Sequence, residues 1–398
     1  MVDLQKTGHL NLSPAVPVKV GSGMQEHATR KKILVVASYQ YIPYFSGGQK
    51  SIAQFLDYLG GESDLTVISV AANDTSLIKS YRHLPWLKRR ALSRYTDLSL
   101  PSKITGLLRS ENFDNIIWEH PYYTWLAKWI RSRTGIRTML HIHNIEFQRF
   151  RSTGKWWWPI LKIYERAFFR LADLDLFVSP DDLAFAVNEW GIPSSRCLEL
   201  AFGVEISGHP QDRDTCKEIL RQKHAITPGE KILLFNGLLD YQPNVDALRI
   251  ILEDVNPLLL QAGLRYRIII CGKGLPAEWN GLESYAGSNI TYAGFVDDIT
   301  IYFKGSDLFL NTVLTGGGVK TKLVESIAFG TTVITTTSGA LGVRKEVCGE
   351  KLRIVADGDW KGFAQAVINA PAQNAITPAS YYEHYFWGNI VKTLLQHC

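Results

Sequence analysis

Short runs of aliphatic residues alternate with helix-like segments along this chain of 398 residues, and this alternation constrains the fold more than any other feature. Patterns of buried strands lie at residues 31–38, 65–70, 115–120, 137–143 and 174–179, and helical or loop segments separate them. Strands that alternate with helices are typical of a parallel sheet covered by helices. We therefore predict an α/β fold.

The same alternation starts again after residue 207, with strand patterns in KILLFNG, RYRIIICGKG, NITYAGFV, DLFLNTVL and TTVITT. A chain of this length exceeds the size at which single cores stop growing, so we expect two domains. We place a mobile tail at 1–30, an N-terminal domain at 31–207 and a C-terminal domain at 208–375. The last segment, 376–398, is helical and too aromatic to be a solvent-exposed tail, so it should pack on another surface.

The composition is that of a soluble globular enzyme, with 46% hydrophobic residues, 20% charged residues and a mean hydropathy of -0.05. No apolar run approaches the roughly 20 residues that a spanning helix needs, and the first residues lack the pattern of a signal peptide. The five cysteines form no CxxC pair, which disfavours a disulfide framework and a zinc site. We expect a cytoplasmic protein with reduced thiols.

The segment TGGGVKTKLVESIAFGT, residues 315–331, joins a predicted strand to a predicted helix. A helix start offers unpaired backbone N–H groups, and glycine lets a phosphate approach them closely. Lys320 and Lys322 would add positive charge. The alternative is that the glycines only form a tight turn and that Lys322 pairs with Glu325, three residues later on the helix surface.

The order of the motifs resembles that of the GT4-type glycosyltransferases. In the second half it is GLLDYQPNVDAL, CGKG, TYAGFVDDITIYFKGSDLFL and the glycine-lysine segment, and in the first half it is a loop with two glycines, HIHNIE, YERAFFRLADLDLFVSPDD and AFGVEI. The resemblance covers residues 31–398 and is strongest to a subgroup that acts in bacterial polysaccharide and glycolipid assembly. It implies the GT-B fold, in which two Rossmann-like domains face each other across a cleft and the C-terminal helix crosses back to the N-terminal domain.

The resemblance also implies roles for residues of the glycine-lysine segment. Glu325 matches the second glutamate of an E-x7-E signature, which accepts hydrogen bonds from the ribose of a sugar nucleotide. The first glutamate of that signature would stand at Gly317, so this chain lacks it. We expect backbone amides to hold the donor sugar instead, and the residues that supply them are Gly316, Gly317, Gly318 and Val319.

Many family members hold the diphosphate with an arginine and a lysine after the GxL segment, but GLLDYQPN contains neither. Lys320 and Lys322 are the nearest candidates to stabilise the leaving diphosphate, so we predict them as catalytic residues. Further donor contacts implied by the resemblance are Gly47, Gly48, Gly237, Phe295 and Val296. Asn244 either contacts the donor or caps the helix that follows, and we favour the cap.

His143 ends a predicted strand, where α/β sheets bind their ligands. The resemblance places a histidine here, lining the cleft near the donor sugar, so we predict His143 as a third catalytic residue. His141 lies on the same face of the strand and is more readily explained as structural. Glu119 and His120 form a similar pair at the end of another strand and are weaker candidates.

Two segments combine cations with aromatic residues. One is 76–110, and the other is RFRSTGKWWWPILK, residues 149–162. Such segments fit peripheral contact with an anionic membrane, where a lipid acceptor would lie. The alternative is a solvated basic face with the tryptophans in the core.

We therefore predict a retaining glycosyltransferase that moves a sugar from a nucleotide-sugar donor to a hydroxyl of a glycan or lipid-linked acceptor, without metal or cofactor. It would act in the cytoplasm, either free or on the cytoplasmic face of a membrane, and would not bind nucleic acid. Two other classes stay open, namely a catalytically silent sugar-nucleotide-binding protein and a sugar-nucleotide epimerase of similar fold.

Overall fold

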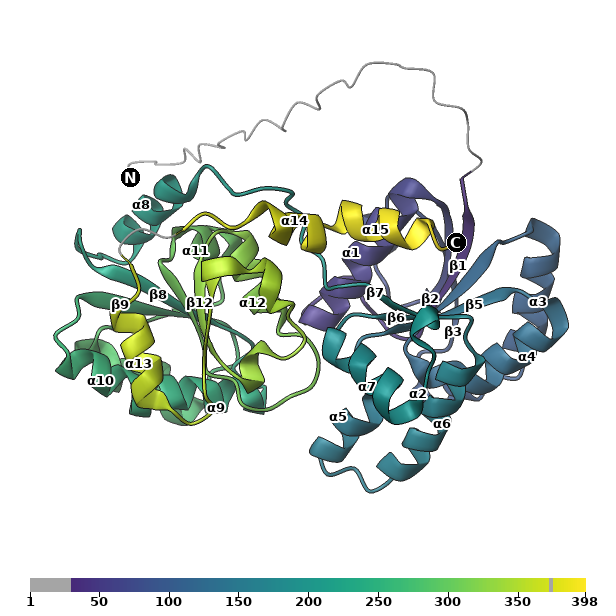
Figure 1. Ribbon diagram of the computed structural model, residues 1–398, viewed down its shortest axis with the longest axis horizontal. Helices are drawn as coiled ribbons and strands as arrows, with labels where there is room; N and C mark the ends of the chain where they lie inside the picture. Colours follow the sequence, from purple (N-terminus) through teal and green to yellow (C-terminus); the bar gives the residue numbers. More distant parts are fainter. Residues whose placement is uncertain (1–29, 372–374) are drawn as a thin grey trace, which may run out of the picture. The chain divides into compact units, whose positions relative to one another are not determined.

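The computed structural model describes residues 30–371 and 375–398, and it contains two separate parallel sheets (Figure 1). The predicted tail, 1–30, lies outside the described residues except for Arg30. Lys31–Cys398 form one unit, and everything below concerns this unit. The predicted domain boundaries stay a prediction, although the first sheet ends at Glu199 and the second begins at Lys231.

The first sheet has seven strands in the order β3-β2-β1-β4-β5-β6-β7. The strands are β1 (Lys32–Ala37), β2 (Asp64–Val70), β3 (Arg82–Leu87), β4 (Asn115–Glu119), β5 (Arg137–Ile142), β6 (Leu174–Phe177) and β7 (Cys197–Glu199). All neighbouring strands pair in parallel. The direction of winding changes between β1 and β4, and α/β sheets bind ligands outside the carboxyl ends of the strands at this point.

The second sheet has six parallel strands in the order β10-β9-β8-β11-β12-β13. They are β8 (Lys231–Asn236), β9 (Tyr266–Cys271), β10 (Ile290–Gly294), β11 (Leu308–Asn311), β12 (Thr332–Thr336) and β13 (Leu352–Val355). Here the winding changes between β8 and β11. The glycine turn follows β11, so it lies at the corresponding position of the second sheet.

The helices cover both faces of each sheet (Figure 1). Around the first sheet they are α1 (Gly47–Glu62), α2 (Ala91–Tyr95), α3 (Leu100–Glu111), α4 (Thr124–Thr134), α5 (Glu146–Ser152), α6 (Trp158–Leu171) and α7 (Pro180–Trp190). Around the second sheet they are α8 (Arg213–Lys223), α9 (Gln242–Ile250), α10 (Asn256–Gln261), α11 (Ile299–Gly305), α12 (Thr321–Ala328) and α13 (Trp360–Ile368). The last two are α14 (Ala379–Tyr385) and α15 (Trp387–Leu395).

Alternation along the strands distributes the apolar side chains between the two faces of the first sheet, because successive residues of a strand point to opposite faces. In β1, Ile33 and Val35 belong to one buried cluster, whereas Leu34 and Val36 belong to another. The first of these clusters also contains residues of the second sheet and of the C-terminal helices. One continuous apolar core therefore connects these parts.

The C-terminal helices run from the second sheet back to the first, as the resemblance implied (Figure 1). The Tyr381 hydroxyl of α14 donates to the carbonyl of Val324 in α12 at 2.6 Å. The Trp387 indole of α15 donates to the side chain of Gln54 in α1 at 3.0 Å. The structure confirms the predicted α/β class, with two Rossmann-like sheets and a C-terminal helix that returns to the N-terminal part.

Strands β3, β7 and β13 were not expected from the sequence. β3 lies inside the basic segment 76–110, and its sequence RHLPWL shows no clean strand pattern because proline and cations interrupt it. Leu84 and Trp86 nevertheless pack against a buried cluster. This segment is therefore partly an edge strand of the first sheet and not one continuous basic surface.

All five cysteines are free thiols, as expected, and three of them are buried. Within residues 30–371 and 375–398, no helix combines the length and the apolar character that crossing a membrane requires.

Candidate functional site

The glycine turn that follows β11 has an unusual backbone. Gly316 and Gly318 have φ angles of 94° and 69°, in the left-handed region that favours glycine. Lys320 occupies the N-cap position of α12, and no side chain caps this helix start. The first N–H groups of α12 are thus available to an anionic ligand.

Lys320 folds back onto the turn. Its ammonium donates to the carbonyls of Gly316 at 2.9 Å and Gly318 at 3.0 Å. Burial lowers the pKa of Lys320 to about 8, although the Asp182 carboxylate opposes this change. Lys320 therefore stabilises the turn while it holds a charge that varies near neutral pH.

The side chain of Lys322 points away from solvent and toward the end of β8. Its ammonium donates to the Asn236 carbonyl and to the Asn244 side-chain oxygen, both at 2.8 Å. Burial, helped by the charge of Lys320, lowers the pKa of Lys322 to about 7. The alternative in which Lys322 pairs with Glu325 is wrong.

Asn244 does not cap its helix. Tyr241 is the N-cap of α9, and Asn244 lies inside the first turn. Its amide donates to the Leu238 carbonyl at 2.8 Å while its oxygen accepts from Lys322. The favoured cap assignment is therefore wrong, because Asn244 links the lysine to the loop after β8.

Gly237, a predicted donor contact, lies beside the same lysine. A Cβ at this position would come within 3.0 Å of the Lys322 ammonium and 2.8 Å of the Asn244 amide. Glycine is needed here because the neighbouring side chains fill the space.

Glu325 forms an ion pair with Lys50, a residue of α1 that the sequence did not single out. The side chain of Lys50 is 23% exposed and that of Glu325 is 14% exposed. Burial opposes the charge on Lys50, but the neighbouring Glu325 carboxylate outweighs this effect and raises the pKa of Lys50. The carboxylate predicted to bind ribose therefore already has a cationic partner.

The two glycines of the first loop begin α1, which Ser46 caps together with Gln49. A Cβ at Gly47 would lie 2.5 Å from the Thr321 hydroxyl, whereas a Cβ at Gly48 would meet no atom within 4 Å. The start of α1 thus touches the start of α12, and Gly48 borders open space.

His143 and His141 share one carboxylate, that of Glu119 at the end of β4. The Nε2 atom of His143 lies 2.7 Å from Oε2 of Glu119, and the Nδ1 atom of His141 lies 3.0 Å from Oε1. Burial raises the pKa of Glu119, but the charges and hydrogen bonds of both histidines outweigh it and lower that pKa. Burial and the charge of His141 lower the pKa of His143, although the Glu119 carboxylate opposes this change.

His120 extends this polar cluster. Its Nε2 atom lies 2.7 Å from the Tyr39 hydroxyl, and its ring stacks on those of His143 and Tyr122 at 4.5 and 5.2 Å. The Glu146 carboxylate lies 3.6 Å from Nδ1 of His120. Although burial opposes ionisation, His120 and Arg149 lower the pKa of Glu146 to about 2.

The segment after β5 meets the glycine turn. A Cβ at Gly318 would lie 2.2 Å from Oδ1 of Asn144 and 3.4 Å from the His143 carbonyl. A Cβ at Gly317 would meet Asn144 at 3.5 Å and Arg149 at 3.6 Å, so a methyl group would fit there without a clash. The structure therefore brings His143 and the glycine turn together.

Two predicted donor contacts are less closely connected to the turn. Phe295 and Val296 directly follow β10, and Phe295 is 70% exposed. Gly294 accepts a hydrogen bond from Gly272 at 2.8 Å, and a Cβ at Gly272 would lie 1.9 Å from the Gly237 carbonyl. Val319, the last of the predicted donor contacts in the glycine turn, packs against Gly342.

Glu119, His141 and His143 are close enough to hold a metal ion, since their ligand atoms lie within 4.8 Å of one another. Two histidines and a carboxylate are ligands that zinc accepts. Each of the two histidines already forms a hydrogen bond to the carboxylate. The prediction that no metal is needed stays a prediction.

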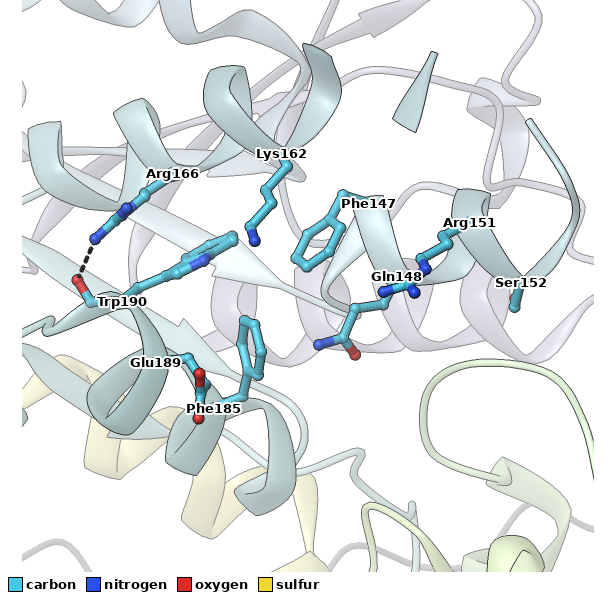
Figure 2. A pocket seen from close by; sticks show the side chains of 9 residues that line it. All are labelled: Phe147, Gln148, Arg151, Ser152, Lys162, Arg166, Phe185, Glu189 and Trp190. Carbon is cyan, nitrogen blue, oxygen red and sulfur yellow. Dashed lines mark hydrogen bonds between the residues drawn. The ribbon is translucent and has the colours of Figure 1, made fainter. Parts of the chain in front are cut away.

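A separate cavity of about 530 Å³ lies between α5, α6 and α7 (Figure 2). Aromatic and basic side chains predominate in its lining, which is made by Phe147, Gln148, Arg151, Ser152, Lys162, Arg166, Phe185, Glu189 and Trp190. Arg166 donates to the Trp190 carbonyl at 3.3 Å, and the Lys162 ammonium lies 5.2 Å from the centre of the Phe147 ring. Trp156, just before α6, is 81% exposed, so not all three tryptophans belong to the core.

Two family profiles match the chain. Residues 45–205 match the profile described as Glycosyltransferase Family 4, and residues 230–372 match the one described as Glycosyl transferases group 1. An uncharacterized 44.6 kDa protein in the cps region of Klebsiella pneumoniae is 23% identical over 365 residues, which are 85% of this chain and 90% of that protein.

Solved structures show the same architecture. A glycosyltransferase from Rickettsia africae superposes with a TM-score of 0.68 at 14% identity, over 93% of this chain and 98% of its own. The Anabaena protein HepE, solved in complex with UDP-glucose, has a TM-score of 0.63 at 15% identity, over 92% of this chain and 98% of its own.

Two parallel Rossmann-like sheets joined by returning C-terminal helices are the GT-B fold, which the solved structures share. The chain belongs to the group 1 glycosyltransferases, family 4, and is an enzyme of that family.

Proposed function

We propose that this enzyme is a retaining glycosyltransferase that moves a sugar from a nucleoside-diphosphate sugar to a hydroxyl of a glycan or lipid-linked acceptor. The observation that carries this proposal is the position of the glycine turn. Its uncapped helix start lies beside Lys320 and Lys322, and its outer side meets His143 and Asn144. A related structure, HepE, was solved with UDP-glucose, which supports a nucleotide-sugar donor.

The diphosphate would bind at the start of α12. Backbone N–H groups and the positive end of the helix attract an anion there, and the two lysines add charge as the glycosidic bond breaks. Glu325, one turn further along α12, would accept hydrogen bonds from the ribose hydroxyls.

The donor sugar would lie between the glycine turn and His143. Because Gly317 offers no carboxylate, the N–H groups of Gly316 to Val319 are the groups proposed to hold its hydroxyls. The Nε2 atom of His143 is hydrogen-bonded to Glu119. The Nδ1 atom of that ring is therefore the one proposed to bond to a sugar or acceptor hydroxyl. Glu119 is in this view a positioning residue for His143.

The acceptor is proposed to be a growing polysaccharide or its lipid-linked precursor. The Klebsiella relative lies in a cps region, which supports a role in polysaccharide assembly. On and beside α6, Trp156, Ile160 and Ile163 are 81%, 66% and 74% exposed, and Lys155 is exposed among them. Exposed apolar side chains with cations favour contact with an anionic membrane surface.

A thermal-shift screen tests the donor site directly. The purified protein would be heated with UDP, GDP and TDP and with their sugars, and at least one should raise the melting temperature, because a ligand that binds the folded state stabilises it. A flat response to all of them would overturn the donor-site assignment.

Turnover tests the proposed transfer, because Gly317 replaces the first glutamate of the family signature. The enzyme should release nucleoside diphosphate in proportion to the glycosylated acceptor. Donor binding with no release on any acceptor would contradict the proposed transfer.

A further inference from the structure

Lys50 and Glu325 are 275 residues apart in the sequence, yet their side chains form an ion pair between α1 and α12. Both belong to elements next to the proposed donor site. Lys50 stands two residues after Gly48, which borders open space, and Gly47 touches the first residue of α12. The pair therefore lies at the place where ribose and diphosphate are proposed to bind.

Breaking such a pair has a cost. Removing one partner of a poorly solvated ion pair leaves the other charge without compensation. A ligand that binds only Glu325, as a free nucleoside would, displaces Lys50 and provides no new partner for it. A nucleoside diphosphate offers a ribose diol to the carboxylate and an anion to the ammonium.

The other two lysines of the site already have internal partners. Lys320 bonds to carbonyls of the turn, and Lys322 bonds to Asn236 and Asn244. Burial lowers the pKa of both, to about 8 and about 7, whereas the pKa of Lys50 is raised by Glu325. Of these three lysines, Lys50 is the one whose pKa is not lowered.

We propose that Lys50 is a donor-binding residue that exchanges partners: it covers Glu325 in the free enzyme and moves to the diphosphate when a nucleoside diphosphate binds. This inference rests on the proposed function. It assigns to Lys50 part of the diphosphate binding that the loop after β8 does not provide, since GLLDYQPN carries no cation. It also makes the site discriminate against free nucleosides.

The test compares two ligands on matched variants. Affinities for UDP and uridine, and for GDP and guanosine, are measured by titration calorimetry on the full chain. Lys50→Met removes the charge and keeps the length, Lys50→Arg keeps the charge, and Lys103→Met on the exposed face of α3 is the control. Melting temperatures of all variants show that they are folded.

The exchange predicts opposite effects on the two kinds of ligand. Lys50→Met should weaken binding of the diphosphate by about tenfold or more, while the nucleoside binds as well as before or more tightly. Lys50→Arg and Lys103→Met should keep the ratio between the two affinities. If Lys50→Met leaves both affinities unchanged, or lowers both by the same factor, the ion pair is only a structural connection and the exchange is wrong.

The failure of the proposed function would look different. If the unmodified protein binds neither diphosphate, both the donor site and the exchange are wrong. If it binds one of them and only the ratio in Lys50→Met fails to change, the exchange alone is wrong. In case Lys50→Met does not fold, Glu325→Gln provides the same comparison from the other partner, because it frees Lys50 and should weaken the nucleoside more than the diphosphate.

Discussion

At the scale of single residues, the site depends on charges held by short and specific contacts. Lys322 is bound by Asn236 and Asn244, Lys50 by Glu325, and His143 by Glu119. Each of these contacts joins groups from different elements, and the Asn236 group is its backbone carbonyl. The charge state of each group follows from its burial and its partner, so the site should respond to pH and to conservative substitution.

Binding of nucleoside diphosphate should weaken as pH rises from 7 to 9. In the free enzyme the pKa values of Lys322 and Lys320 are lowered to about 7 and about 8, and a bound anion raises them again. The affinity is therefore highest below the pKa of the free lysines and falls by up to about tenfold per pH unit for each lysine that must gain a proton. Titration with UDP across this range measures the slope.

Lys322→Met should bind UDP more weakly and should lose part of that slope. Lys50 stays charged throughout the range because its pKa is raised. An affinity that is constant between pH 7 and 9 in the unmodified protein would contradict the assignment of both lysines to the diphosphate.

Glu119→Gln should lower kcat by roughly tenfold to a hundredfold, because an amide has only one oxygen to accept bonds from two histidines and therefore lets the His143 ring reorient. Affinity for the nucleotide should change little, since the Glu119 carboxylate bonds to His141 and His143 and is not among the groups proposed to bind the nucleotide. Initial rates of sugar transfer, with UDP affinity as the control, measure this. An unchanged kcat would show that His143 does not need Glu119.

At the scale of elements, the connection from β11 to α12 carries the proposed donor site and has glycines with positive φ angles. Gly318 has a positive φ and lies against Asn144, whereas a Cβ at Gly317 would make only ordinary van der Waals contacts. Two adjacent glycines of one turn therefore differ in whether they tolerate a Cβ atom.

Gly318→Ala should reduce nucleotide affinity and transfer by at least about tenfold, because its Cβ would lie 2.2 Å from Oδ1 of Asn144 and would strain the backbone. Gly317→Ala should have a smaller effect, since its Cβ would meet nothing closer than 3.5 Å. Titration and activity assays on the two variants compare them directly. Equal losses would mean that the turn rearranges when the donor binds.

At the scale of the whole molecule, the C-terminal helices connect the two sheets. Trp387 is 1% exposed, donates to Gln54 in α1 and packs beside Phe55 and Phe202. A Cβ at Gly203 would lie 2.1 Å from its ring. The tryptophan therefore fills a tight space between α15, α1 and the segment that follows β7.

Trp387→Ala should destabilise the protein by about 3–5 kcal/mol, the usual cost of deleting a buried tryptophan. Trp156→Ala is the matched control, since Trp156 is 81% exposed and its loss should change stability by less than about 0.5 kcal/mol. Denaturant unfolding of both variants gives the comparison. Similar midpoints would show that α15 contributes little to the fold.

From the sequence alone, the α/β class, most strands, the turn after β11 and the packing of an aromatic C-terminal helix on another surface could be predicted. These follow from local periodicity and from glycines next to a helix start, both of which can be seen within a short window. The edge strand β3 was not predicted, because proline and cations interrupt its pattern of apolar residues.

Which groups meet became visible in the three-dimensional structure. Lys50 faces Glu325, Lys322 faces Asn244, and Glu119 lies between two histidines, although each pair is distant in sequence. A lysine two residues after a double glycine was visible in the sequence, but nothing there named its partner. Local patterns follow from backbone geometry, whereas partners depend on how separate strands and helices are brought together, and no short window contains that information.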